Sequence, residues 1–369
     1  MDKYKQMKTV AICNSCIKNI QPDVIIQDFK LNDETIPIGI LDVPEPNYEK
    51  YFNSDSIIVK VKAFSCNYRD KGLLHIFNEQ CKKLSIQQKY FYSPFGSEFV
   101  AEVIKIGEDV KSLKVGDRII PDGTYPFRKS GNLGGLPTNY ASQRIQIFKE
   151  EQVIKIPDSM PDEIAASFTI GAQTTYSMLR KLQLKPNENL LITSGSSNTS
   201  LFMINAVKNR GINVYVTSTN ESHKEDFIKM GVKEFIPYSN FIDKSLDVKF
   251  NAIVDPFFDI SLKHVLHFMD FFSRYITCGL YYQHSFFEKT NSDVDFKKKL
   301  FFCLMNNISL IGNCLGSKED LEKALVDFDN NKLDVIIDSV FSGDDVIPFL
   351  EKTFSIVPRF GKVVYKYDD

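Results

Sequence analysis

A turn of small polar residues stands where a nucleotide phosphate could bind. It follows the apolar segment NLLITSG (189–195), precedes TSLFMINAVKNRG (199–211), and offers Gly195, Ser197, Asn198 and Thr199 as contacts. In a strand–turn–helix unit, small residues let backbone N–H groups approach a pyrophosphate at the positive helix end. Only the first of three expected glycines is present, with Ser197 and Ser200 in the other places. An ordinary capped helix explains these residues equally well, because Ser and Thr are favoured N-caps.

The second strand of such a unit ends in hydroxyls and a cation rather than in a carboxylate. The segment NVYVTST (213–219) ends with Ser218 and Thr219, and His223 and Lys224 follow. An Asp or Glu at this place would bind the ribose 2′-OH of NAD, whereas hydroxyls and positive charge suit a 2′-phosphate. The four residues therefore favour NADP over NAD, and the alternative is a solvated polar loop.

The elements that must position these residues fall into two parts. Up to about residue 160, alternating segments at 54–65, 99–107 and 117–123 predict short strands of a compact, barrel-like domain. From Pro161 onward the pattern changes, and residues 161–182 have helical spacing with an acidic first turn. Helical segments at 199–211 and 223–231 then alternate with strand segments at 189–195, 213–219, 234–239, 250–256 and 273–280. This alternation predicts a parallel sheet with helical crossovers. A helix at 317–331 and a strand at 361–367 complete the chain.

Composition excludes several classes of protein. The 369 residues suffice for two domains, and 45 Lys and Arg against 47 Asp and Glu leave no basic field for nucleic acid. Seven scattered cysteines do not form a disulfide framework, and no apolar run reaches the length of a membrane helix. The first residues, MDKYKQMKTVAICNSC, are charged, so we expect no signal peptide and a cytoplasmic protein.

Eight segments in a fixed order resemble the medium-chain dehydrogenase/reductase superfamily, which includes zinc alcohol dehydrogenases and zinc-free quinone and enoyl reductases. The resemblance spans about residues 54–369. The segments are VKAFSCNYRDKGL (61–73), PFGSEFVAEVIKIGEDVKSLKVGDRII (94–120), GGLPTNYAS (134–142), GAQTTYSML (171–179), LLITSGSSNTS (190–200), RYITCGL (274–280), LIGNCLGS (310–317) and RFGKVV (359–364).

The resemblance implies an α/β fold with a Rossmann domain, a doubly wound parallel sheet, and a β-rich GroES-like catalytic domain. We expect the catalytic domain at 1–170, an NADP-binding domain at 171–312 and a C-terminal return to the catalytic domain at 313–369. The active site would lie in the cleft between the domains. The resemblance also implies a homodimer formed along the edge strand around 307–312.

The zinc ligands of the metal-dependent members are not matched here. Asn67 or Cys66 stands near the place of the first cysteine, Ser97 replaces the histidine, and Ile170 stands four residues before Thr174, where the last cysteine is expected. A hydroxyl is a poor zinc ligand, and isoleucine is none. We therefore expect no metal. Zinc-free relatives reduce activated C=C bonds: hydride reaches the carbon β to a carbonyl, and donors must stabilise the enolate oxygen.

The resemblance assigns further residues to this chemistry. Tyr68 is the candidate donor to the enolate or the product carbon, and Asn67 would hold the substrate carbonyl or the nicotinamide ribose. Arg69 and Asp70 are expected to form a structural ion pair, and Glu98 to support the site. Thr174 would touch the nicotinamide, Gly279, Leu280 and Asn313 would line it, and Lys362 would reach the cofactor phosphates. The segment at 72–93 would be a lid over a larger substrate or simply a surface loop.

These observations favour a cytoplasmic, zinc-independent, NADPH-dependent reductase of an activated C=C bond. The substrate would be a small molecule or a peptide: an enone, a quinone, an enoyl thioester, or a dehydroamino acid such as dehydroalanine in a lantibiotic. Two alternatives remain open. One is a non-enzymatic relative that has lost its cofactor, and the other is an alcohol dehydrogenase or carbonyl reductase with an unusual metal site.

Overall fold

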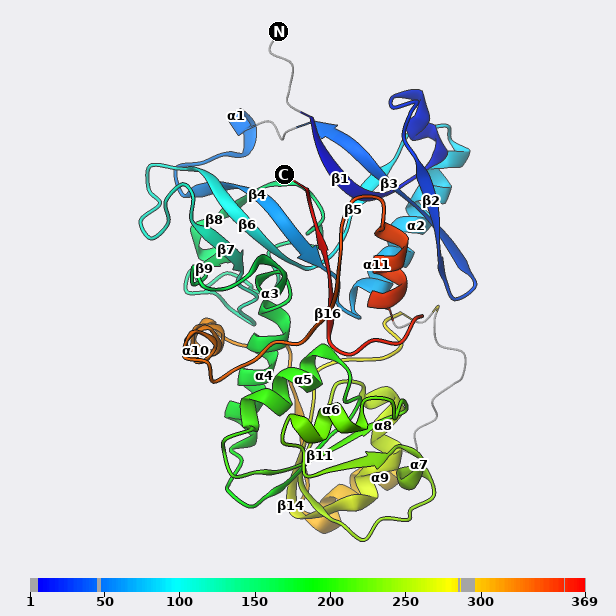
Figure 1. Ribbon diagram of the computed structural model, residues 1–369, viewed down its shortest axis with the longest axis vertical. Coiled ribbons are helices and arrows are strands. Elements are labelled where there is room, and N and C mark those ends of the chain that lie inside the picture. Colours follow the sequence, from blue (N-terminus) through cyan, green and yellow to red (C-terminus); the bar gives the residue numbers. More distant parts are fainter. Residues whose placement is uncertain (1–5, 45–47, 285, 287–295, 355, 369) are drawn as a thin grey trace. The chain divides into compact units, whose positions relative to one another are not determined.

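The computed structural model describes residues 6–44, 48–284, 286, 296–354 and 356–368. The chain divides into two compact units, one made of Met1–Thr169 with Ile337–Asp369 and the other of Ile170–Ile336. The mixed α/β class and the pairing of a β-rich unit with a parallel-sheet unit agree with the sequence prediction (Figure 1).

The second unit contains one parallel six-stranded sheet. Its order is β12-β11-β10-β13-β14-β15, the strand order of a dinucleotide-binding Rossmann fold. The first strand sits at the centre, with Leu190 opposite Val214 on one side and Ala252 on the other. The strands are β10 (Asn189–Ile192), β11 (Asn213–Ser218), β12 (Glu234–Pro237), β13 (Phe250–Asp255), β14 (Met269–Thr277) and β15 (Ser309–Gly312).

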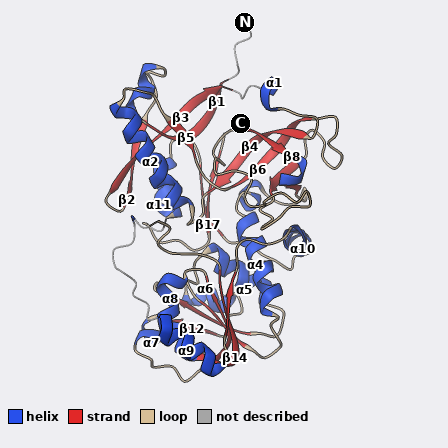
Figure 2. Ribbon diagram, turned by 180° about the vertical axis from the view of Figure 1, so that it is seen from behind, coloured by secondary structure: helices blue, strands red, loops and turns tan. Residues whose placement is uncertain are grey.

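Helices cover both faces of this sheet (Figure 2). Leu191, Phe250, Ile253 and Tyr275 belong to the core beneath them. Most of these helices lie between consecutive strands, because a parallel strand needs a crossover to reach its neighbour. The helices are α4 (Thr169–Leu182), α5 (Asn198–Val207), α6 (Lys224–Lys229), α7 (Ser239–Ile242), α8 (Phe258–Val265), the short η3 (Leu266–Phe268), α9 (Phe296–Asn306) and α10 (Lys318–Asp329).

The second unit extends to Ile336, so the return to the first unit begins at 337 rather than at the predicted 313. The difference is α10, which is bound to α4. The Tyr176 hydroxyl donates to Asp327 over 2.7 Å, and the Arg180 guanidinium binds both oxygens of Asp320 at 3.0 and 2.7 Å. These side-chain bonds join residues about 140 positions apart, which no local pattern in the sequence reveals.

Two sheets form the first unit. The larger has the order β16-β17-β4-β6-β7-β9, with β8 also paired to β4, and the smaller has the order β2-β3-β1-β5. Strand β17, from the end of the chain, pairs antiparallel with β4, and this return is visible in red in Figure 1. The strands are β1 (Gln6–Cys13), β2 (Ile26–Leu31), β3 (Glu34–Pro44), β4 (Ser56–Ser65), β5 (Tyr92–Pro94), β6 (Glu98–Ile106), β7 (Arg118–Pro121), β8 (Ile145–Lys149), β9 (Val153–Lys155), β16 (Ile337–Phe341) and β17 (Lys362–Lys366).

Two helical assignments in and near this unit differ from the prediction. The segment predicted as a lid or a surface loop at 72–93 is largely the helix α2 (Asp70–Ile86), which packs on β1 and β3. The single helix predicted at 161–182 is two helices, α3 (Asp162–Ala165) and α4, because the chain turns at Ser167 and Phe168. The remaining helices are α1 (Tyr48–Tyr51), α11 (Val346–Thr353) and the short η1 (Ser15–Asn19) and η2 (Glu150–Gln152).

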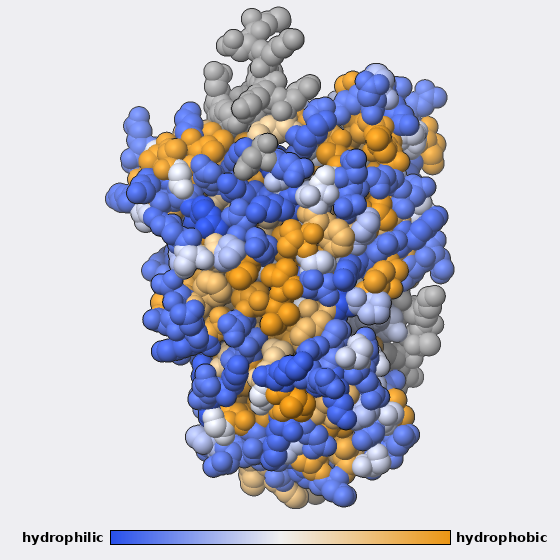
Figure 3. Space-filling view, viewed as in Figure 1, coloured by the Kyte–Doolittle hydropathy of each residue, from blue (hydrophilic) through white to orange (hydrophobic). Residues whose placement is uncertain are grey.

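On the face drawn in Figure 3, hydrophilic residues cover most of the surface, and apolar residues lie in several groups among them. In the part of the chain that the structure describes, no helix combines the length and the apolar character needed to cross a membrane.

Candidate functional site

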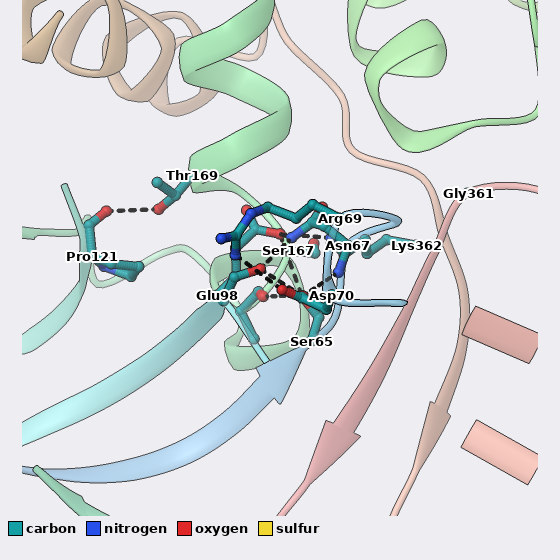
Figure 4. A network of polar contacts seen from close by, with 12 residues as sticks. Ser65, Asn67, Arg69, Asp70, Glu98, Pro121, Ser167, Thr169, Gly361 and Lys362 are labelled. Carbon is teal, nitrogen blue, oxygen red and sulfur yellow. Dashed lines mark hydrogen bonds and ion pairs between the residues drawn. The ribbon is translucent and has the colours of Figure 1, made fainter. Parts of the chain in front are cut away.

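Three neighbouring strands of the first unit bring a set of polar side chains together. Strand β4 pairs with β6 so that Ser65 lies opposite Glu98, and β17 pairs with β4 so that Tyr365 lies opposite Phe64. Asn67, just after β4, therefore comes close to Glu98 at the start of β6 and to Lys362 at the start of β17 (Figure 4). The site is thus built by strand register, from residues almost 300 positions apart.

An ion pair lies at the centre of this site. The Lys362 Nζ donates to Glu98 Oε2 and to Asn67 Oδ1, each at 2.6 Å, and the Asn67 Nδ2 donates to Glu98 Oε2 at 2.7 Å. Lys362 is 3% exposed and Glu98 is fully buried. A buried charge needs a partner of opposite sign, and here each charge provides it for the other.

A second buried carboxylate, Asp70, extends the network. Its Oδ2 accepts from the Asn67 backbone N–H at 2.8 Å and from the Ser97 hydroxyl at 2.7 Å, and its Oδ1 accepts from Arg69 Nη1 at 3.0 Å. The expected ion pair between Arg69 and Asp70 is therefore present. Burial raises the pKa of the Asp70 carboxyl, against the lowering effects of Arg69 and these hydrogen bonds. This network fixes the chain between β4 and α2.

The donor set around Asn67 does not fit a catalytic zinc ion. Burial raises the pKa of the Cys66 thiol well above its usual value, whereas zinc needs a thiolate. The Ser97 hydroxyl is engaged with Asp70, and the Lys362 ammonium binds the Glu98 carboxylate directly. The position of a cation beside Glu98 is therefore taken by a side chain.

Among the described residues, one group has ligand atoms close enough together to hold a metal, namely Glu34, His75 and Glu79. The Lys82 ammonium lies 3.0 Å from Glu34 Oε1 and 2.7 Å from Glu79 Oε1. A lysine cation therefore already stands between these carboxylates.

Two cations that the sequence did not single out lie near Tyr68, the predicted donor. The Lys71 Nζ is 5.7 Å from the centre of the Tyr68 ring, and burial lowers the pKa of Lys71. Burial also lowers the pKa of Arg359, against the opposing effects of Tyr68 and Asp338. Lys71 and Arg359 both belong to segments that carry the family resemblance. Their place in these segments is the feature of the sequence by which they could have been predicted to lie near Tyr68.

In the second unit, the turn after β10 contains the helix cap that the sequence offered as one of two explanations. The Ser197 hydroxyl accepts from the Ser200 backbone N–H at 3.3 Å, which makes it the N-cap of α5. A Cβ on Gly195 would lie 2.3 Å from Val216 Cγ1 and 2.8 Å from Phe227 Cζ, so only glycine fits. Close packing of this kind is one role of glycine in a dinucleotide-binding turn. Asn198 and Thr199 form the first turn of α5, whose N–H groups lack helical acceptors.

The candidate phosphate contacts after β11 differ in their availability. Thr219 and Lys224 are exposed, whereas Ser218 is buried and its hydroxyl accepts from the Asn220 backbone N–H at 3.2 Å. The His223 Nδ1 lies 3.1 Å from Asp226 Oδ2, so a carboxylate already engages this ring. Thr219 and Lys224 are consequently the better placed of the four for an anionic group.

The predicted nicotinamide contacts all lie in the second unit, and one of them has a structural task. The Asn313 side chain accepts from the Ser177 hydroxyl at 2.8 Å and donates to the Leu315 carbonyl at 2.9 Å. A Cβ on Gly279 would lie 2.8 Å from the Pro256 carbonyl oxygen, so the backbone passes close here. Thr174 is buried on α4, and Leu280 is 38% exposed.

Lys362 has partners that the sequence did not suggest. The expectation was a contact with the cofactor phosphates, but its ammonium is bound to Glu98 and Asn67 in the first unit. Sequence reasoning also missed Asp255, a buried carboxyl at the end of β13 that accepts from Thr193 and Tyr275. Burial raises the pKa of Asp255, and burial together with Asp255 raises that of Tyr275.

Comparison with known proteins agrees with this architecture. Residues 53–158 match the alcohol dehydrogenase GroES-like domain. The acryloyl-coenzyme A reductase of Metallosphaera sedula is 25% identical over 289 residues, which cover 74% of this chain and 80% of that protein.

Solved structures with the same fold include two oxidoreductases. A thermostable alcohol dehydrogenase from Pyrobaculum aerophilum has a TM-score of 0.72 at 16% identity, covering 98% of this chain and 100% of that one. A crotonyl-CoA carboxylase/reductase in complex with NADP has a TM-score of 0.73 at 16% identity, covering 98% and 95%. With the GroES-like domain, the Rossmann strand order and these relatives in view, the chain is similar over most of its length to oxidoreductases of the medium-chain dehydrogenase/reductase superfamily.

Proposed function

We propose that this protein is a zinc-independent, NADPH-dependent reductase that transfers hydride to an activated C=C bond. The observation that carries the proposal is the donor set around Asn67, in which the Lys362 ammonium pairs with the buried Glu98 carboxylate and the Ser97 hydroxyl is engaged with Asp70, so no set of zinc ligands is present among these residues. In the zinc-dependent alcohol dehydrogenases, a Lewis acid polarises the alcohol oxygen. Reduction of a C=C bond beside a carbonyl needs only donors for the enolate oxygen and a proton.

The cofactor would bind in the second unit. Its pyrophosphate would meet the first turn of α5, Gly195 would allow the close approach, and Thr219 and Lys224 would receive a 2′-phosphate. Ser197, Asn198, Ser218 and His223 complete the proposed phosphate-binding surface, and Thr174, Gly279, Leu280 and Asn313 the nicotinamide side. Bound NADPH supplies the hydride, and Tyr68 and Asn67 are the proposed contacts of the substrate.

The names of the relatives favour a thioester substrate. The similar proteins include acryloyl-coenzyme A reductases, and the structural neighbours include a crotonyl-CoA carboxylase/reductase. We place short enoyl thioesters first, ahead of enones, quinones and dehydroamino acids such as dehydroalanine in a lantibiotic peptide. We further propose a cytoplasmic homodimer.

Steady-state oxidation of NADPH against a panel of acceptors tests the proposal. The panel contains an enoyl thioester, a cyclic enone, a quinone and a dehydroalanine derivative, with NADH in parallel. We expect turnover of at least one alkene with preference for NADPH, without added metal and in the presence of a chelator. Oxidation of simple alcohols that depends on added zinc, with no alkene reduced, would contradict the proposal and favour the alcohol dehydrogenase alternative.

A further inference from the structure

A buried carboxylate joins three neighbouring strands of the second unit at the end where the chain leaves β10 for α5. Asp255 ends β13, which lies between β10 and β14 in the sheet, and its side chain is fully buried. Its Oδ1 accepts from the Thr193 hydroxyl at 2.6 Å and from the Phe257 backbone N–H at 3.0 Å. Its Oδ2 accepts from the Tyr275 hydroxyl. Hydrogen bonds rather than an ion pair therefore offset the cost of burying this carboxyl.

Thr193 connects the carboxylate to the turn that precedes α5. It directly follows β10, and its carbonyl oxygen accepts from the Ser200 hydroxyl at 2.8 Å. The Ser197 hydroxyl donates to Ser200 Oγ at 2.8 Å, and Ser197 is the N-cap of the helix. A continuous chain of contacts therefore runs from Asp255 to the helix end at which the cofactor pyrophosphate is proposed to bind.

The turn contains a backbone conformation that needs such support. Ser194 has a φ of 50°, in the left-handed region that side chains other than those of Asn and Asp rarely adopt. A strained residue of this kind persists where the surrounding structure fixes it, and such residues are common at ligand-binding sites. On one side of Ser194, Thr193 is held by its bond to Asp255. On the other side, the Gly195 N–H donates to the Thr217 carbonyl oxygen at 3.0 Å.

The two hydroxyl groups that bind Asp255 approach it from opposite sides. Thr193 comes from β10, which leads directly into the turn, whereas Tyr275 lies in β14 on the other side of β13. The Tyr275 side chain belongs to the buried core of the second unit. Loss of either hydroxyl removes one donor from the same carboxyl, but only the loss at Thr193 releases the end of β10. This difference separates a role in cofactor binding from a role in folding.

We propose that Asp255 is a positioning residue for the dinucleotide: through the Thr193 hydroxyl it holds the end of β10, and so keeps the strained turn at Ser194 in the conformation that receives the pyrophosphate. This inference rests on the proposed function. Asp255 acts through Thr193 rather than on the cofactor, by setting the fraction of the protein whose turn is ready to bind. The apparent dissociation constant rises in proportion as that fraction falls. Because NADPH and NADH share the pyrophosphate, both should be affected alike.

The test compares nucleotide binding by purified variants and the wild type. Thr193→Val removes the hydroxyl and keeps the shape of the side chain, and Thr193→Ser keeps the hydroxyl. Tyr275→Phe is the matched control, because it removes the other hydroxyl donor from the same carboxyl. Asp255→Leu removes the acceptor at similar volume, and its combination with Thr193→Val completes a double-mutant cycle.

The measurements are the dissociation constants of NADPH and NADH by fluorescence, kcat at saturating NADPH with the best alkene, and the thermal midpoint. Thr193→Val should raise both dissociation constants by roughly tenfold, as expected when a hydrogen bond to a charged group is lost. Its kcat should stay within about threefold of the wild type, because saturating cofactor restores the bound conformation. Thr193→Ser should bind as the wild type does.

The control and the cycle separate positioning from stability. Tyr275→Phe should lower the thermal midpoint as Thr193→Val does, yet leave both dissociation constants within about twofold, the usual limit for an independent site. The double variant should bind no more weakly than Asp255→Leu alone, because the two residues act as one unit. If Asp255→Leu does not fold, the comparison of Thr193→Val with Thr193→Ser and Tyr275→Phe decides alone.

Three outcomes would overturn the inference. Thr193→Val could bind both nucleotides as tightly as the wild type, which would show that the turn does not depend on this bond. Tyr275→Phe could weaken binding as much as Thr193→Val, and the carboxylate would then act only through general stability. Thr193→Ser could bind as weakly as Thr193→Val, in which case the hydroxyl is not the link. A wild type that binds neither nucleotide contradicts the proposed function itself, before any variant is compared.

Discussion

Lys224 is an exposed cation at the start of α6, in the segment that follows β11. If it contacts the 2′-phosphate, Lys224→Ala should raise the KM for NADPH by roughly tenfold and leave the KM for NADH unchanged. The size follows from the worth of a hydrogen bond to a charged group, about 1.5–3 kcal/mol, reduced by solvent at an exposed site. The matched control is Lys229→Ala, at the other end of the same helix. Equal effects of the two variants on NADPH would refute this role for Lys224.

The residues of the first unit show which parts of the candidate site could be predicted from the sequence and which could not. The segments containing Asn67 and Glu98 were singled out because a short motif carries each of them, and the structure joins the two residues by a hydrogen bond. The partner of Lys362 could not be predicted, since its place depends on the register of β17 against β4. The glycine-poor turn was also ambiguous from sequence. The space around Gly195 depends on Val216 and Phe227, which come from later elements.

At the scale of elements, β3 and α2 are joined by one buried carboxylate. Glu34 accepts from Asn78 and lies 2.8 Å from His75 Nδ1 and 3.0 Å from Lys82 Nζ. Burial alone would raise the pKa of Glu34, but the hydrogen bonds from His75, Asn78 and Lys82 outweigh it and hold the pKa below its usual value. The charged form of Glu34 therefore stabilises the contact between the two elements.

Because folding lowers the pKa of Glu34, the contribution of its side chain to the free energy of unfolding should depend on pH. A carboxyl whose pKa is lowered by folding contributes stability above its unfolded pKa of about 4.3 and loses it as the pH falls through the native pKa. Glu34→Gln should therefore reduce the free energy of unfolding by about 1–3 kcal/mol at about pH 7 and by much less at about pH 3. Urea unfolding at both pH values measures the difference. Glu79→Gln, with its side chain 56% exposed, is the control and should change little.

The same helix explains why part of the fold was mispredicted. Residues 72–93 are rich in lysine, glutamine and aromatic residues, which suggested a surface loop, but Leu74, His75, Asn78 and Cys81 form one buried face of α2. Two of these four are polar, so the apolar periodicity was weak. The strands of the second unit were predicted closely, because buried parallel strands are continuous apolar runs.

The turn between β10 and α5 gives a prediction about packing between elements. Gly195→Ala places a methyl group within 2.3 Å of Val216 Cγ1, and both that side chain and Phe227 are buried. Overpacking of this kind costs about 1–3 kcal/mol, so the free energy of unfolding should fall by that amount. NADPH affinity should fall as well, because the turn must shift. Ser196→Ala, in the same turn, adds no atom and should behave as the wild type does. A Gly195→Ala protein of unchanged stability would contradict the packing described here.

At the scale of the whole molecule, the second unit carries an apolar surface beside its edge strand. In the described residues, β15 has β14 as its only strand neighbour, so its other edge offers unpaired backbone groups. A hollow of about 580 Å³ beside it is lined by residues of α9, of β15 and of the turn between them, namely Leu300, Phe301, Cys303, Leu304, Asn307, Ile308 and Leu310. Leu304 is 73% exposed and Phe301 61%.

A second copy of the chain is the expected partner of this surface, since pairing two β15 strands would continue the sheet and cover both hollows. Leu304→Asp places a charge in the middle of the apolar contact and should convert the dimer to a monomer. Light scattering after gel filtration measures the mass directly. The control is Ile86→Asp, which adds the same charge at an 84% exposed position at the end of α2 and should remain dimeric. A wild-type monomer, or a Leu304→Asp dimer of unchanged stability, would rule out this surface as the interface.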